Sequence, residues 1–111
     1  MKTNTEIVSA ISAQGILPLF YQDDYSVCKE IVQSLYQAGI RVIEFTNRGP
    51  AALVNFTTLI QERDNLWPGL IFGAGTIKNL EDTRAFLAAG ADFLISPAFI
   101  LPLRKLYKKK N

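Results

Sequence analysis

The segment "VIEFTNR", residues 42–48, joins an apolar stretch to two charged residues that could carry chemistry together. Strand side chains alternate between faces, so Val42, Glu44 and Thr46 share one side, and Arg48 follows four residues after the glutamate. An unpaired buried carboxylate is costly, so Glu44 needs a partner or a function. A partly desolvated glutamate suits proton transfer, and an arginine fork suits a substrate carboxylate. A structural ion pair is the alternative interpretation.

Two later segments supply further candidates. In "GAGT", residues 73–76, two glycines allow a ligand to approach the backbone, and Thr76 places a hydroxyl at the start of a helix, which favours an anion. The segment is not a dinucleotide fingerprint, because the third glycine of G-x-G-x-x-G is missing. Packing of a strand against a helix would also explain both glycines. Ser96 and Pro97 follow the last apolar segment.

The composition indicates one ordinary domain with one core, because the chain has 111 residues, of which 49% are hydrophobic and 20% charged. Its apolar runs are shorter than the roughly 18 residues of a membrane helix, and its start lacks a secretory signal, so we expect a cytoplasmic protein. The sequence has one cysteine and no histidine. We therefore expect no internal disulfide and no zinc or copper site.

Positive charge is concentrated at the C-terminus. Residues 104–111 hold five of the twelve Lys and Arg residues, which leaves seven positive against ten negative side chains elsewhere. A basic tail can bind nucleic acid or anionic lipid through counterion release. However, the rest of the chain offers no basic face, so we expect a solvated tail and neither nucleic acid nor membrane as a partner. The expected division is a domain over 1–103 and a tail over 104–111.

Strands and helices alternate along the chain. A short N-terminal helix is expected to end at Gly15, and helices are expected after each of the first three strands. The expected strands are 16–20, 42–46, 70–74 and 92–96, and the segment 64–69 is expected to be a turn. This repeat predicts an α/β fold with parallel strands, as an open doubly wound sheet or an arc of a (β/α)8 barrel. In both architectures, ligands bind at the carboxyl ends of the strands, where the candidates above lie.

A family resemblance rests on four segments taken together, "GILPLF", "AGIRVIEFTNR", "GLIFGAGTI" and "AAGADFLISPAF". In order and spacing, over roughly residues 4–99, they resemble the N-terminal half of the 2-keto-3-deoxy-6-phosphogluconate (KDPG) and 4-hydroxy-2-oxoglutarate (KHG) aldolases, class I enzymes built on a TIM barrel. The resemblance implies a parallel (βα)4 half of such a barrel, with strand order 1-2-3-4, helices on one face and an N-terminal helix. It also implies reversible cleavage of a keto acid to pyruvate and an aldehyde, without metal or cofactor.

The resemblance further implies roles for individual residues. Glu44 corresponds to the proton shuttle, while Arg48 and Thr76 correspond to the residues that hold the carboxylate of the keto acid. The complete substrate-binding set that it implies is Arg48, Thr76, Gly75, Ser96 and Pro97. In this chemistry a lysine amine condenses with the C2 ketone, and the resulting iminium withdraws electrons so that the C3–C4 bond breaks.

The sequence also departs from the family. The Schiff-base lysine of these aldolases lies on the sixth strand, whereas the resemblance here stops after the fourth. Lys78 is the lysine closest in sequence to the site, and we expect it to be solvated in a first helical turn. Three interpretations follow: an aldolase fragment with little or no activity alone, a structural or assembly module, or a contact of the tail with nucleic acid or membrane. The fragment would arise from truncation, a shifted reading frame or engineering.

The expected half barrel has open edges at 16–20 and at 93–96. It would also expose an apolar inner face, to which we assign Val42 and Phe72. Exposed strand edges and apolar area favour association, so a homo-oligomer through the open barrel edges is expected. The alternative is that the N-terminal helix or the tail folds over the open face.

Overall fold

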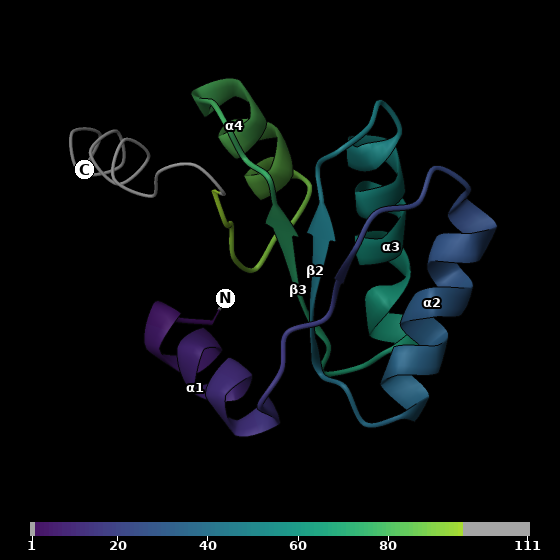
Figure 1. The fold of residues 1–111 in the computed structure, drawn as a ribbon, viewed down its shortest axis with the longest axis vertical. Coiled ribbons are helices and arrows are strands. Elements are labelled where there is room, and N and C mark those ends of the chain that lie inside the picture. Colours follow the sequence, from purple (N-terminus) through teal and green to yellow (C-terminus); the bar gives the residue numbers. More distant parts are fainter. Residues whose placement is uncertain (1, 97–111) are drawn as a thin grey trace.

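The computed structural model describes residues 2–96, so Pro97 and the basic tail at 104–111 lie outside the described part. Three parallel strands form one sheet in the order β1-β2-β3, which confirms the predicted α/β fold with parallel strands (Figure 1). The elements in chain order are α1 (Asn4–Gln14), β1 (Leu19–Phe20), α2 (Tyr25–Gln37), β2 (Val42–Thr46), α3 (Ala52–Leu66), β3 (Ile71–Gly75) and α4 (Leu80–Ala88).

The two outer strands are shorter than predicted. β1 begins only at Leu19, because Pro18 has no N–H to give to a ladder, although its carbonyl accepts from the N–H of Glu44 at 2.9 Å. The fourth strand is reduced to a parallel bridge between Ala74 and Leu94. The N–H of Ala74 donates to the carbonyl of Phe93 at 3.0 Å, so this segment extends the sheet beside β3 in the predicted order.

The predicted turn at 64–69 is wrong in its first half, because α3 continues to Leu66. The helix ends at Trp67, the residue before Pro68, where the proline ring disfavours helical backbone. The indole of Trp67 is fully buried and donates to Oε1 of Gln33 in α2 at 2.7 Å. Packing between the two helices therefore fixes where α3 ends.

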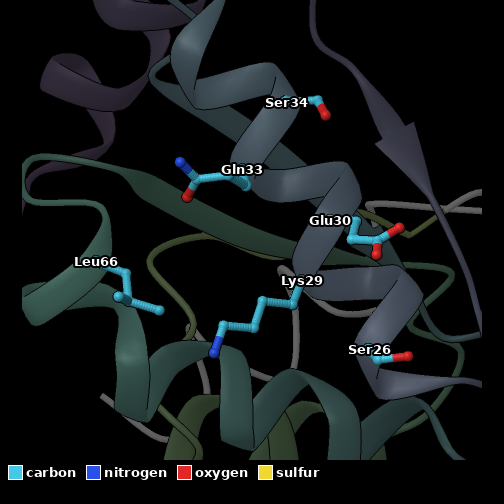
Figure 2. A pocket seen from close by; sticks show the side chains of 6 residues that line it. All are labelled: Ser26, Lys29, Glu30, Gln33, Ser34 and Leu66. Atoms are coloured by element: carbon cyan, nitrogen blue, oxygen red, sulfur yellow. The ribbon is translucent and has the colours of Figure 1, made fainter.

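Helices α2 and α3 pack against each other on the outer side of the sheet. Lys29 of α2 forms an ion pair with Glu62 of α3 at 3.0 Å, and the hydroxyl of Tyr25 donates to the same carboxylate. A shallow hollow of about 590 Å³ lies beside this ion pair (Figure 2). It is lined by Ser26, Lys29, Glu30, Gln33, Ser34 and Leu66.

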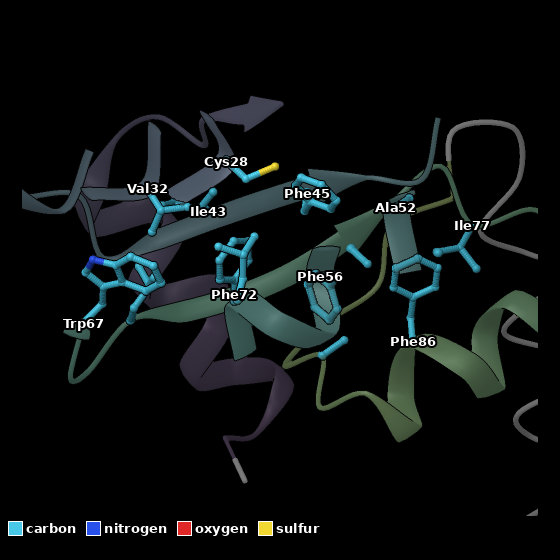
Figure 3. Close-up of a cluster of buried hydrophobic side chains, with 14 residues drawn as sticks. Cys28, Val32, Ile43, Phe45, Ala52, Phe56, Trp67, Phe72, Ile77 and Phe86 are labelled. Carbon is cyan, nitrogen blue, oxygen red and sulfur yellow. The ribbon is translucent and has the colours of Figure 1, made fainter. Parts of the chain in front are cut away.

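The main core lies between the sheet and helices α2 to α4 (Figure 3). Phe56 of α3 is its centre, since its ring packs edge-on against Phe72 of β3 and Phe86 of α4, with ring centroids 5.5 and 5.4 Å away. The assignment of Phe72 to the inner face is therefore wrong. Ile43 and Phe72 are partners in the register of β2 and β3, and both point toward the helices.

Helix α1 lies on the opposite side of the sheet from α2 and α3 (Figure 1). Its Ile7 forms a second apolar cluster with Val42 and Ile71, so Val42 is buried rather than exposed on an open inner face. The amide of Gln14 accepts from the N–H of Val42 at 3.0 Å and donates to the carbonyl of the same residue at 3.0 Å. The N-terminal helix thus covers the inner face at the amino ends of the strands. Among the helices of residues 2–96, none is long and apolar enough to cross a membrane.

Asp92 connects α3 to the sheet, and its loss should be costly. Its carboxylate accepts from Arg63 at 2.6 Å and from the N–H of Phe72 at 2.8 Å, so Asp92→Ala leaves the buried N–H of Phe72 unpaired and takes away the closer carboxylate partner of Arg63. We expect a loss of about 2–3 kcal/mol in the free energy of unfolding, measured by urea denaturation. Asp64 also pairs with Arg63, at 3.7 Å, but is 94% exposed, so the control Asp64→Ala should cost at most about 0.5 kcal/mol. Equal losses in both variants would contradict this account.

Candidate active site

The inner face of the sheet carries polar residues at the carboxyl ends of its strands. Glu44 and Thr46 lie on this face of β2, opposite Gly73 and Gly75 of β3 in the register. Glu44 is only 5% exposed, and its carboxylate lies against Gly75. The hydroxyl of Thr46 is buried and donates to the carbonyl of Phe20 at 3.2 Å, so it holds β1 against β2. The structure therefore brings the predicted Glu44 and Gly75 together.

The electrostatics of Glu44 suit proton transfer. Burial raises the pKa of the Glu44 carboxyl above its usual value, and the positive charge of Arg48 opposes that rise. Arg48 itself is exposed in the loop after β2, where its N–H donates to the carbonyl of Thr46 at 2.9 Å. Within residues 2–96, no ion pair joins the two side chains, so the alternative of a structural ion pair receives no support there. The guanidinium is left available for an anion.

The raised pKa of Glu44 predicts a pH dependence of stability. The folded state binds this proton more tightly than the unfolded state, so stability falls as pH rises from the ordinary glutamate range through the raised pKa. Glu44→Gln removes that fall. We therefore expect wild-type stability, relative to this variant, to decrease in urea denaturation as pH rises above about 4.3, the ordinary glutamate value.

Glu6 provides a control of opposite sign. Hydrogen bonds with the backbone and hydroxyl of Thr3 lower the pKa of Glu6, so its contribution to stability is present at neutral pH and is lost as pH falls. Relative to Glu6→Gln, wild-type stability should therefore rise with pH, and this rise should be complete once pH exceeds the ordinary glutamate range. A wild-type curve that runs parallel to that of Glu44→Gln would show that Glu44 titrates as an ordinary exposed glutamate.

Thr76 adds a strained backbone position to the site. Its φ is 59°, which is rare for a β-branched residue and is typical of functional sites. The residue is half-buried directly after β3, and the next residue, Ile77, donates its N–H to the carbonyl of Ile95 at 3.1 Å. Sequence reasoning selected Thr76 for its hydroxyl and missed this conformation, which has no signal in the residue type.

Asn47 is a supporting residue that sequence reasoning also missed. Its N–H donates to the carbonyl of Gly75 at 2.8 Å, and its amide donates to Asp82 of α4 at 3.2 Å. Asn79 caps the same helix by accepting from the N–H of Asp82 at 2.7 Å. The loop that carries Arg48 is therefore tied to both β3 and α4. The position of Asn47 between Thr46 and Arg48 was the available signal.

The remaining predicted residues lie at the margin of the described part. Ser96 is half-buried and is the last described residue, while Pro97 lies beyond it. Lys78 is exposed just before α4. The hollow of Figure 2 lies on the helix side of the sheet, away from Glu44, so it is separate from this site. Within the part of the chain that the structure describes, no cluster of three or more His, Cys, Asp or Glu side chains could hold a metal ion.

Comparison with known proteins agrees with this arrangement. A family model described as "Aldolase: KDPG and KHG aldolase" matches residues 7–111. The chain belongs to this aldolase family. It is 32% identical over 104 residues to the 2-dehydro-3-deoxy-phosphogluconate aldolase of Dickeya dadantii. The aligned segment covers 94% of this chain and 46% of the relative. It is 30% identical, with the same coverage, to the KHG/KDPG aldolase of Escherichia coli K12. This aldolase-family chain thus spans about half the length of the curated relatives it matches.

Solved aldolases share the fold. The KDPG aldolase of Legionella pneumophila, crystallised with pyruvate captured as a covalent carbinolamine, matches with a TM-score of 0.68 and 30% identity, over 75% of this chain and 38% of that chain. The Zymomonas mobilis ZM4 enzyme, with 3-phosphoglycerate, matches with a TM-score of 0.74 and 28% identity, over 87% of this chain and 44% of that one. These relatives belong to the TIM-barrel class, which confirms the predicted half of such a barrel.

Proposed function

We propose that this chain supplies the proton-transfer and carboxylate-binding half of a class I aldolase site. The reaction is the reversible cleavage of a KDPG or KHG type keto acid to pyruvate and an aldehyde. The observation that carries the proposal is Glu44, a carboxylate buried at the carboxyl end of a parallel sheet, with its pKa raised by that burial. Membership of the KDPG and KHG aldolase family supports the same reaction.

Each site residue has a role in this proposal. Glu44 moves protons at the substrate hydroxyl and at C3, because burial raises its pKa and so makes the carboxylate a stronger base than an exposed glutamate. Arg48 and Thr76 bind the carboxylate of the keto acid through the guanidinium and the hydroxyl. Gly75, Ser96 and Pro97 border the site.

The Schiff-base lysine is proposed to lie outside residues 2–96. An amine must add to the C2 ketone and lose water to form the iminium, so it has to face the substrate from inside the barrel. Lys29 instead pairs with Glu62 on the helix side, while Lys2 and Lys78 are exposed outside the strands. The amine therefore has to come from a later part of the family's barrel or from a second chain, and residues 2–96 alone should be inactive.

Binding of pyruvate to the chain tests the proposed anion site. We expect pyruvate to shift the amide NMR signals of Gly75 and Thr76, and Arg48→Ala to weaken this binding about tenfold or more, because a charge-assisted hydrogen bond is lost. Arg84 of α4 is also exposed and gives a control with the same change in charge. Shifts at other residues only, or equal weakening by Arg84→Ala, would refute the site.

A second candidate is an assembly module that forms a homo-oligomer through open barrel edges. It is favoured by the apolar side chains at the edge strand, since Leu19 is 57% exposed and Ile16 is 63% exposed. A parallel strand from a second copy would pair with β1 and cover both residues. Sedimentation at micromolar concentration checks this proposal, which predicts a dimer or larger species, whereas a cooperative, well-folded monomer would exclude it.

A further inference from the structure

We propose that Gly75 is a positioning residue, whose missing side chain provides the niche that holds the Glu44 carboxylate. The inference builds on the proposed role of Glu44 in proton transfer, and it assigns to the second glycine of "GAGT" a task other than contact with a substrate. The niche sets where the carboxylate stands at the carboxyl end of β3, directly before Thr76.

The geometry at residue 75 leaves no room for a side chain. A Cβ at this position would lie 1.7 Å from Oε2 of Glu44 and 2.5 Å from its Cδ, far inside any allowed contact. The backbone does not demand glycine here, because Gly75 is not one of the described glycines with a positive φ. The carboxylate itself is therefore the reason for glycine at this position.

A second glycine explains why Glu44 turns toward Gly75. The direct partner of Glu44 in the register is Gly73, and a Cβ there would lie 2.3 Å from the ring of Phe93. The ring of Phe93 thus fills the space beside β3 at the level of Glu44. The glutamate side chain leans toward the carboxyl end of the sheet, where the space over Gly75 is free. The two glycines divide the inner surface of β3 between one aromatic ring and one carboxylate.

Packing, rather than hydrogen bonding, holds the carboxylate. Among residues 2–96, no side chain or backbone group donates a hydrogen bond to Glu44 Oε1 or Oε2. Its oxygens therefore keep their acceptor sites for a substrate hydroxyl or a water. A carboxylate held in this way depends on the shape of its niche, so a single added methyl group should displace it.

Gly75→Ala in the full chain tests the inference without any substrate. Carbon-13 NMR titration of the glutamate carboxyls should show the pKa of Glu44 shifted down toward that of an ordinary glutamate, because the displaced group moves into water. The melting temperature should fall on the order of 10 °C, as expected for an overpacked site. In a Glu44→Ala background, the same glycine substitution should lower the melting temperature by less than half as much.

Gly73→Ala is the matched control. The added methyl group collides with the ring of Phe93. The decrease in melting temperature that Gly73→Ala causes should therefore persist in the Glu44→Ala background. An unchanged pKa of Glu44 in Gly75→Ala, or equal losses in both backgrounds, would overturn the inference. If Gly75→Ala does not fold, the Glu44→Ala/Gly75→Ala double variant decides, since a folded protein supports the niche and an unfolded one refutes it. None of these results depends on pyruvate binding, so failure of the proposed function leaves the test intact.

Discussion

Glu44→Gln is expected to lower the rate of keto-acid cleavage by a factor of about 100 to 10,000, the usual contribution of a positioned acid–base group. The assay requires the rest of the barrel, so residues 1–96 are joined to the remaining part of the Dickeya dadantii relative, to which the chain is 32% identical. Glutamine keeps the size and burial of the side chain but cannot exchange a proton. The loss should therefore appear in kcat far more than in KM.

Glu81→Gln in the same chimera is the control for this prediction. The same substitution of glutamate by glutamine is made at Glu81, which is exposed in the first turn of α4 and lies away from the inner face. Its variant should retain full activity. Near neutral pH, both variants should have the melting temperature of the unsubstituted chimera or a slightly higher one. Comparable activity in Glu44→Gln and the unsubstituted chimera would remove Glu44 from the mechanism.

Trp67→Ala is expected to destabilise the chain by about 3–5 kcal/mol, enough to unfold much of it at room temperature. The indole is fully buried between α2 and α3 at the end of the latter helix. Its loss leaves a cavity in the main core and takes away the donor for Gln33. Urea denaturation followed by circular dichroism measures the loss.

Leu66, the residue before Trp67, serves as the control for this prediction. Its side chain is 40% exposed and borders the shallow hollow. Leu66→Ala should cost about 1 kcal/mol or less, since little apolar area returns to water. A similar cost for both substitutions would mean that the end of α3 is not anchored by the indole. Native stability with Trp67→Ala would contradict the packing described above.

The sequence predicted the faces of β2 better than the faces of β3. Alternation within β2 placed Glu44 on the inner face correctly, because polar and apolar residues differ there. β3 offers no such contrast, since "IFGAG" is apolar or small throughout, and Phe72 was assigned to the wrong face. Its face follows from the register with β2, which depends on the packing of the whole sheet.

Other features depend on contacts between residues distant in sequence. The burial of Val42 by α1 was only an alternative in the sequence analysis, because amphipathic spacing indicates a helix but not the surface it covers. The niche at Gly75 could not be predicted from the sequence either, because predicting it requires the direction in which the Glu44 side chain leans. The turn expected at 64–69 begins too early, because the burial of Trp67 against α2 depends on the tertiary packing and accompanies a helix that continues to Leu66.

The proposed function assigns the proton shuttle of a class I aldolase site to residues 2–96 and the Schiff-base lysine to another part of the barrel. Borohydride reduction in the presence of pyruvate, followed by mass spectrometry of the peptides, tests it most directly. The predicted result is no adduct on the chain alone, and one pyruvate adduct in the chimera, on a lysine of the relative's part. A pyruvate adduct on Lys78, or on any other lysine of this chain, would contradict the account.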